Sequence, residues 1–172
     1  MKSGCSLVDL AQELERQLAT KQDLVVPSSL LRCHTDEAGS CRMVIDAKDG
    51  GGEYGMTELA RRQLAEKLKI PFAYFERMRA EQPSLLEGNV NTWLQADPER
   101  RMLRTLDGQV RAVLSDRYRR LDHYDLAEHV LPFLQRLPDA RFESVELTET
   151  KMYIKVVTPR VEFEIAPGDV VQ

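Results

Sequence analysis

Two runs of alternating apolar and polar residues flank the pair Asp107-Gly108. An Asp-Gly pair between two such runs predicts a β-hairpin with a type I′ turn, because both turn residues must adopt a positive φ. The turn then sets four cross-strand pairs: Leu106 with Gln109, Thr105 with Val110, Arg104 with Arg111, and Leu103 with Ala112. Since side chains alternate between the faces of a strand, one face is expected to enter the core. The residues of that face are Leu103, Thr105, Val110, Ala112 and Leu114.

The opposite face of this hairpin is predicted to place Arg104 directly across from Arg111. Two guanidinium groups in that arrangement destabilise a hairpin unless an anion meets them. Either a carboxylate of the protein or the phosphate backbone of a nucleic acid would supply that charge. The sequence leaves both alternatives open.

Apolar residues also recur at helical spacing near the N-terminus, from Leu7 to Leu18. Ser6, with Asp9 three residues later, is close to a capping box, which marks the start of a helix. We expect this N-terminal helix within residues 1–25. A strand around residues 41–46 follows, closed by a glycine-rich turn at residues 49–52.

Two more helices are indicated over residues 57–83. Thr57 suits the N-cap of the first helix, and Pro71 suits the first position of the second. The pair is similar to a helix-turn-helix, but Phe72 and Glu76 near the start of the second helix are poor readers of DNA bases. We therefore favour a helical hairpin that packs on a sheet.

A polar connection through Asn89, Asn91 and the sole tryptophan, Trp93, is expected to lead into the arginine hairpin. Beyond that hairpin, Asp122 with Asp125 three residues later predicts a capped helix. Pro132 lies within this predicted helix and is expected to kink or shorten it.

The C-terminal part of the chain predicts mainly strands. A second hairpin is expected over residues 141–148 and 151–158, and an edge strand over residues 161–165. Residues 167–172 resemble a turn that enters a further strand, so we expect the chain to be a fragment. Hairpins interrupted by helices indicate an α+β fold, mainly an antiparallel sheet built from hairpins with helices packed on one face. Residues 26–172 are expected to form a single α+β domain, truncated at its C-terminal end.

The composition is that of an ordinary globular protein. The chain has 172 residues, 42% of them hydrophobic and 30% charged, which is sufficient for a folded core. It contains no apolar run long enough to span a membrane and no signal-peptide pattern. Cys5, Cys33 and Cys41 show no C-x-x-C spacing, so we expect reduced thiols and a cytoplasmic location.

The net charge of −4 hides an uneven distribution. Residues 100–120 carry seven basic and two acidic side chains, a net charge of +5, whereas residues 1–99 carry −4 and residues 121–172 carry −5. One concentrated basic element is able to bind nucleic acid locally, with an affinity that falls as salt rises. The alternative is that these arginines pair with the flanking acidic segments.

Several sequence strings form a recognisable set. They are Tyr54-Gly55-Met56-Thr57 with Gln63-Leu64-Ala65 and Ile70-Pro71; Asn89-Val90-Asn91-Thr92-Trp93-Leu94; Arg104-Thr105-Leu106-Asp107-Gly108; Leu114-Ser115-Asp116-Arg117-Tyr118-Arg119; and Lys155-Val156-Val157-Thr158-Pro159. Together they resemble the phage/plasmid-like family of unknown function that is found in prophages and mobile elements. The resemblance implies a cytoplasmic product of a mobile element, of which this chain is the N-terminal part. It implies no activity and no catalytic residues.

A second similarity concerns architecture alone. Single-strand annealing proteins of phage recombination also combine a basic hairpin with a curved antiparallel sheet and a packing helix. Because one fold serves many functions, this similarity is an analogy.

Arginine and tyrosine alternate directly after the predicted hairpin. Guanidinium groups suit phosphates and a tyrosine ring suits stacking on a base, a combination typical of single-strand binding. The alternative is a local ion pair of Asp116 with a neighbouring arginine, with the Tyr118 ring turned into the core. The candidate nucleic-acid-binding residues are Trp93, Arg101, Arg104, Arg111, Arg117, Tyr118, Arg119 and Arg120.

No pattern in the sequence indicates an enzyme. Cys33, His34 and Cys41 would give a zinc site three ligands without the usual paired spacing. Ser115 beside Asp116 does not form a triad, because no histidine is fixed near them. There is no phosphate-binding glycine loop followed by lysine. We therefore expect no catalytic residues, no metal and no cofactor.

The sequence favours a non-enzymatic phage or mobile-element protein that binds nucleic acid. Single-stranded DNA, during recombination or replication, is the favoured partner, and self-association into a homo-oligomer is a corollary. The alternative is a protein-interaction module, such as an inhibitor of a host defence or host enzyme, whose acidic segments contact a basic host protein. Neither alternative involves a membrane.

Overall fold

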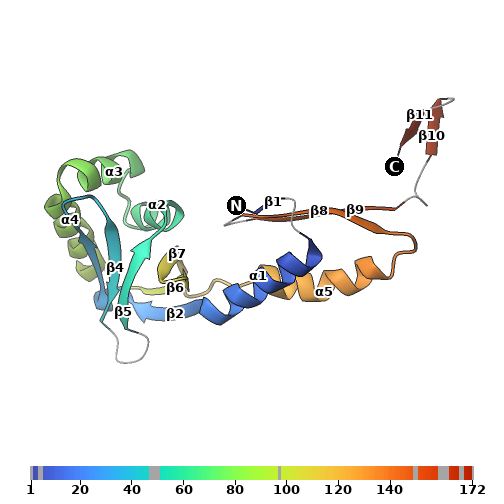
Figure 1. Ribbon diagram of the computed structural model, residues 1–172. Coiled ribbons are helices and arrows are strands. Elements are labelled where there is room, and N and C mark those ends of the chain that lie inside the picture. The colour runs from blue at the N-terminus through green and yellow to red at the C-terminus, as the bar shows by residue number, and fades with distance from the viewer. Residues whose placement is uncertain are drawn as a thin grey trace. The chain divides into compact units, whose positions relative to one another are not determined.

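The computed structural model describes residues 2–3, 6–46, 51–96, 98–148, 151–158, 163–166 and 169–171. It has an α+β fold with a mainly antiparallel six-stranded sheet, as the sequence predicts (Figure 1). The chain folds as two compact units, one formed by Thr20–Arg119 and the other by Met1–Ala19 with Arg120–Gln172. This division differs from the single domain over residues 26–172 that the sequence indicated.

The unit Thr20–Arg119 contains the six-stranded sheet. Its strands are β2 (Gln22–Pro27), β3 (Leu31–Thr35), β4 (Cys41–Ile45), β5 (Gly52–Met56), β6 (Arg100–Leu106) and β7 (Gln109–Ser115). They lie in the order β2-β6-β7-β5-β4-β3. All neighbours are antiparallel except β5 and β7, which run parallel. The glycine-rich turn predicted at residues 49–52 falls partly outside the described residues.

Three helices cover one face of this sheet: α2 (Glu58–Lys67), α3 (Phe72–Glu81) and α4 (Pro83–Ala96). Strands β3 and β4 bury alternate residues and leave those between them more exposed, which is the pattern of a sheet covered on one side. The core between the layers joins Leu64 and Phe75 of the helices to Met43 and Leu103 of the strands. The expected helical hairpin of α2 and α3 is therefore confirmed as a packing element of the core.

The hairpin of β6 and β7 has the predicted turn, since φ is +51° at Asp107 and +73° at Gly108. The predicted pairs nearest the turn, Leu106 with Gln109 and Thr105 with Val110, are also confirmed. A β-bulge follows, however, and shifts Arg104 opposite Ala112 and Leu103 opposite Val113. The predicted pairing of Arg104 with Arg111 is therefore wrong.

The bulge also changes which residues of β7 are buried. An extra residue in a strand reverses the alternation beyond it, so Val113 enters the core while Ala112 and Leu114 remain partly exposed. On the side opposite β6, β7 has no strand partner beyond Val110, because its pairing with β5 ends at Met56. Helix α2 then serves as a partner: Gln63 Oε1 accepts a hydrogen bond from the Val113 N–H at 2.8 Å.

Helix α4 occupies the segment for which the sequence predicted a polar connection. Pro83 is its first residue, a position where the missing N–H has no intrahelical partner to lose. One asparagine of the predicted polar connection, Asn91, has a tertiary role. Asn91 Oδ1 accepts a hydrogen bond from the Cys33 N–H at 2.7 Å, and Asn91 Nδ2 donates to the Cys33 carbonyl at 3.0 Å. Glu87, one turn earlier, accepts from the Thr35 N–H at 2.6 Å.

These contacts seal an open sheet edge. β3 is the last strand of the sheet, and an edge strand exposes unpaired backbone groups. Asn91 and Glu87 supply the hydrogen bonds that a further strand would have made. They thereby fix how α4 lies against the sheet.

The second unit contains α1 (Leu7–Thr20), α5 (His123–Gln135), the sheet β1-β8-β9 and the pair β10-β11. The strands are β1 (Lys2–Ser3), β8 (Arg141–Leu147), β9 (Met152–Val157), β10 (Phe163–Ala166) and β11 (Asp169–Val171). Its core includes Leu10, Leu14, Val145 and Leu147. The second predicted hairpin is confirmed, although its turn at residues 149–150 lies outside the described residues.

Both predicted capping boxes are present. The Ser6 hydroxyl accepts from the Asp9 N–H at 3.2 Å while the Asp9 carboxylate accepts from the Ser6 N–H at 3.0 Å, and Asp122 and Asp125 form the corresponding pair. Helix α1 ends at Thr20, and residues 22–27 form β2, so the helix is shorter than the predicted range 1–25. Helix α5 continues to Gln135, past the proline expected to shorten it. Across the described residues, no helix is long and apolar enough to cross a membrane.

The contact between α4 and β3 makes a measurable contribution to stability. Replacing Asn91 by Ala leaves the N–H and C=O of Cys33 without their partners, so we expect a loss of about 1–3 kcal/mol in the free energy of unfolding. Urea unfolding followed by circular dichroism measures it. Thr92→Ala, at the neighbouring exposed position of α4, is the control and should change stability by less than about 0.5 kcal/mol. Equal effects of the two substitutions would contradict the role of Asn91.

Candidate nucleic-acid interface

A cavity of about 570 Å³ lies in the unit Thr20–Arg119. Its wall comes from four segments: the end of α2 with its connection to α3, the first turn of α3, one side of α4, and the start of β6 with the residue before it. The polar and aromatic residues of the wall are Lys67, Lys69, Tyr74, Asn89, Trp93, Glu99 and Arg101. Two of the eight candidate residues, Trp93 and Arg101, are therefore brought together.

Two aromatic rings of the cavity wall are exposed. The side chain of Trp93 on α4 is 53% exposed, and that of Tyr74 on α3 is 45% exposed. Large aromatic side chains normally enter the core or an interface, because each carries a large apolar surface. Here the core of this unit is filled by other residues, and both rings border the cavity instead.

Three cationic side chains also line the cavity. Arg101 is largely buried, with its side chain 14% exposed, and forms an ion pair with Glu99 at 2.7 Å. Within the described residues, Lys67 and Lys69 have no ion-pair partner. Both lysines line the cavity together with Glu99, the carboxylate that pairs with Arg101.

The backbone of Lys69 adopts a conformation that is uncommon for lysine. Its φ is +57°, in the left-handed region that glycine or asparagine usually occupies after a helix. The geometry ends α2 with the Lys69 N–H donating to the Glu66 carbonyl at 3.0 Å and the Ile70 N–H donating to the Ala65 carbonyl at 2.8 Å. A lysine in this region is strained by about 1–3 kcal/mol, and such strain is concentrated at functional sites.

Asn89 contributes a polar atom with no partner. Its side-chain Oδ1 is buried and, of the buried side-chain nitrogen and oxygen atoms in the described residues, it alone lacks a hydrogen bond. An unsatisfied polar atom of this kind is uncommon in a folded protein and requires an explanation.

The arginine- and tyrosine-rich segment lies at the same end of the β6–β7 hairpin as Arg101. Arg101 is paired with Ser115, the last residue of β7. The chain then turns, with the Tyr118 N–H donating to the Ser115 carbonyl at 3.0 Å. Arg117 and Arg119 are exposed, as is the Tyr118 ring, which is 45% exposed. Neither arginine has an ion-pair partner in the part of the chain that the structure describes.

The other candidate arginines lie elsewhere. The Arg104 side chain is 7% exposed, and its Nε donates to Asp23 Oδ1 of β2 at 2.8 Å. Of the two alternatives for its counter-charge, the structure supplies the internal carboxylate. Arg111 is partly buried at the bulge, and Arg120 belongs to the other unit.

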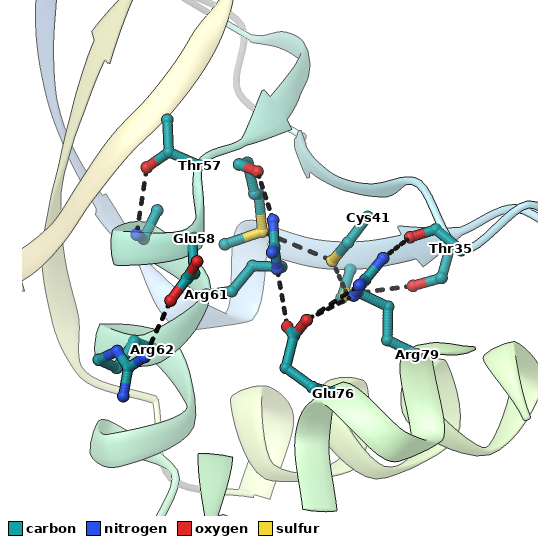
Figure 2. A network of polar contacts seen from close by, with 12 residues as sticks. Thr35, Cys41, Thr57, Glu58, Arg61, Arg62, Glu76 and Arg79 are labelled. Carbon is teal, nitrogen blue, oxygen red and sulfur yellow. Dashed lines mark hydrogen bonds and ion pairs between the residues drawn. The ribbon is translucent and has the colours of Figure 1, made fainter. Parts of the chain in front are cut away.

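A second polar cluster links α2, α3 and the turn between β3 and β4 (Figure 2). Glu76 accepts from Arg61 Nε at 2.9 Å through one carboxylate oxygen and from Arg79 Nε at 2.9 Å through the other. Arg61 also donates to the Met56 carbonyl, and Arg79 to the Gly39 carbonyl. Gly39 has a φ of +75°, and a Cβ there would lie 3.1 Å from the Arg79 carbonyl oxygen. All donors of this cluster face protein groups, which indicates a structural role.

The charges of this cluster set the ionisation of its carboxylate. Partial burial raises the pKa of Glu76, but the hydrogen bonds from Arg61 and Arg79 outweigh burial, so its pKa lies below the ordinary value. Glu76 is therefore ionised over a wider pH range in the folded protein than in the unfolded chain.

Two buried thiols lie close to this cluster. Cys33 Sγ and Cys41 Sγ are 3.4 Å apart, and both are free thiols. The hydrogen bond between them, together with burial, raises the pKa of the Cys33 thiol, whereas the same hydrogen bond lowers the pKa of Cys41. His34 is not part of this pair, because alternate residues of β3 face opposite sides of the sheet; it contacts Glu87 instead, at 2.9 Å.

The described residues therefore do not assemble the zinc ligands considered from the sequence. Among them, no three histidine, cysteine, aspartate or glutamate side chains are grouped for a metal. Cys5 lies outside the described residues.

Sequence reasoning missed Lys67, Lys69, Tyr74 and Asn89. They come from three segments that approach one another only in the folded unit, and the sequence placed Asn89 in a connection. The one local signal was the string Lys67-Leu68-Lys69, where a helix ends without a glycine.

Comparison of the chain with protein-family models, with curated proteins and with solved structures finds no match. The chemistry of the cavity is therefore inferred from its geometry and its residue types.

The burial of Arg104 predicts a strong effect on stability. Arg104→Met removes the guanidinium that the buried Asp23 carboxylate meets at 2.8 Å and should destabilise the protein by about 3–5 kcal/mol. The double variant Asp23→Leu with Arg104→Met removes both charges of this pair and should recover part of that loss, as measured by urea unfolding. Breaking the exposed pair of Arg42 and Glu53 by Arg42→Ala is the control, with an expected cost below about 1 kcal/mol. Equal losses in the single variants Arg104→Met and Arg42→Ala would show that Arg104 is not held internally.

Glu76 predicts an acid-dependent contribution to stability. Because the pKa of Glu76 is lower in the folded than in the unfolded state, its contribution is fully present above its ordinary value of 4.5 and is lost as the pH falls through the folded pKa. Glu76→Gln should therefore cost about 1–2 kcal/mol at neutral pH and much less at about pH 3. Glu81→Gln, at an exposed pair, is the control. An equal cost at both pH values would contradict the assignment.

Proposed function

We propose that this chain is a non-enzymatic nucleic-acid-binding protein of a phage or mobile element that holds single-stranded DNA during recombination or replication. One observation carries the proposal: two exposed aromatic side chains border a cavity that is also lined by two lysines without an ion-pair partner among the described residues. The exposed segment of Arg117, Tyr118 and Arg119 extends the same chemistry from the neighbouring end of the hairpin.

The residue types favour single strands over a duplex. A base stacked on an aromatic side chain contributes about 1–3 kcal/mol, and stacking requires that the face of the base be free. In a duplex that face is covered by neighbouring bases. Lysine and arginine beside the rings attract the phosphates, so binding should weaken as salt rises. The overall charge of −4 restricts such binding to this basic region.

Fluorescence anisotropy of labelled single-stranded and duplex DNA across a salt series tests the proposal. We expect the single strand to bind more tightly and its affinity to fall steeply with salt. Lys67→Ala combined with Lys69→Asn removes two charges while an asparagine suits the positive φ, so it should lower the salt slope by about 1–2 units.

The matched control is Arg32→Ala combined with Arg42→Ala. It changes the net charge by the same amount at exposed positions of β3 and β4, where both arginines are ion-paired. It should leave the salt slope within about 0.5 units of that of the unaltered protein. Equal effects of the two double variants would exclude the cavity as the binding site, and absence of binding at low salt would contradict the proposed function.

A second candidate is a protein-interaction module. Leu121, beside α5, and Phe133, on α5, are both exposed, and residues 121–172 carry a net charge of −5. Exposed apolar side chains next to acidic residues favour a basic protein partner or a second copy of the chain. The anisotropy experiment separates the two candidates, because this one predicts no preference for single strands and no effect of the lysine substitutions.

A further inference from the structure

We propose that the cavity holds a single nucleotide of the bound strand, with its base turned inward against Trp93 and its polar edge on Asn89. This inference rests on the proposed function and adds the ligand of the site: one unstacked nucleobase with its own phosphate. Three independent features of the cavity point to such a ligand.

The first feature is the size and lining of the cavity. Its volume of about 570 Å³ lies within the range of small-molecule sites, about 300–1,000 Å³. The aromatic side chains of Trp93 and Tyr74 give the cavity apolar surface suited to the face of a base.

The second feature is the unpartnered oxygen of Asn89. A buried carbonyl oxygen without a hydrogen bond destabilises the free protein by about 1–3 kcal/mol. Every natural nucleobase carries at least one N–H donor on its hydrogen-bonding edge. Because this oxygen is shielded from solvent in the free protein, a base in the cavity would provide the missing partner once the Asn89 amide rotates toward it. The hydrogen bond is made only in the complex, and Asn89 therefore improves binding while it weakens the free fold.

The third feature is the strained backbone of Lys69. Glycine would adopt its φ of +57° without strain, but glycine would remove the ammonium group from the cavity wall. Lys67 lies two residues earlier on the same wall. These two lysines share a cavity wall with Trp93 and Tyr74, and their charge is suited to the phosphate that accompanies an inserted base.

The sole tryptophan makes the inference testable without a label. Trp93 borders the cavity, so a base that enters should change its fluorescence. We expect deoxyadenosine 5′-monophosphate at millimolar concentration to quench Trp93 and to displace a labelled oligonucleotide. Inorganic phosphate at the same ionic strength should do neither. An oligonucleotide made only of abasic sugar-phosphate units should bind at least tenfold more weakly than the same length with bases.

Asn89→Leu distinguishes a binding role from a structural one. It removes the unsatisfied oxygen at similar side-chain volume, so the variant should unfold at a higher temperature than the parent. It should nevertheless bind deoxyadenosine 5′-monophosphate about tenfold more weakly. If Asn89 had only a structural role, its replacement would not raise the unfolding temperature and weaken nucleotide binding at the same time. Gln95→Ala, at an exposed position of the same helix, is the control and should leave nucleotide affinity unchanged.

Trp93→Leu provides a second variant. It is expected to leave the fold intact, because Trp93 is 53% exposed. It should weaken binding of a labelled oligonucleotide by about tenfold, measured by anisotropy.

Two results would overturn the inference. If oligonucleotides bind but do not quench Trp93 fluorescence and are not displaced by the mononucleotide, the strand does not enter the cavity. The proposed function would still stand. If Asn89→Leu lowers both stability and affinity, the asparagine supports the fold and does not meet the base. Absence of binding by any nucleic acid would overturn the proposed function together with this inference.

Discussion

The hydrogen bonds that Asn91 makes with both backbone groups of Cys33 are the contacts on which the candidate site depends. They hold α4 along the open edge of the sheet and fix its rotation. In a helix with 3.6 residues per turn, side chains four apart lie in the same stripe. The stripe Leu86, Val90 and Leu94 is buried, Glu87 and Asn91 lie on one side of it, and Asn89 and Trp93 lie on the other. Sealing the sheet edge therefore turns Asn89 and Trp93 toward the cavity.

The hairpin of β6 and β7 completes the arrangement from the other side. Its bulge lets β7 pass from pairing with β5 to hydrogen bonding with α2, through Gln63. The strained Lys69 lies two residues beyond the end of the same helix, so α2 and the residues after it both support the hairpin and supply part of the cavity wall. Arg104, in the middle of β6, is used to hold β2 through Asp23, whereas Arg101 at the end of β6 reaches the cavity. Arg104 and Arg101 thus have different roles, because Arg104 lies in the middle of β6 and Arg101 lies next to its first residue.

Local signals in the sequence were sufficient for part of this structure. The Asp107-Gly108 turn and the helix caps were predictable, because each depends on residues adjacent in the chain. The bulge was not, since it depends on where β5 ends and on side chains of α2. Helix α4 was missed because asparagine is a poor helix former in isolation, and the hydrogen bonds of Asn91 to β3 are tertiary. Trp93 and Arg101 were predicted as candidates from their chemistry, but their proximity follows from the packing of α4 and β6 and could not be read from spacing.

The most direct measurement is a ¹H–¹⁵N correlation spectrum of the labelled protein during titration with a short single-stranded oligonucleotide. The indole N–H of Trp93, the side-chain amide of Asn89 and the backbone amide of Lys69 should show the largest shifts, with smaller shifts in Arg117 and Tyr118. Their resonances should move together with a common affinity. Binding that shifts other residues and leaves Trp93, Asn89 and Lys69 unchanged would contradict the account.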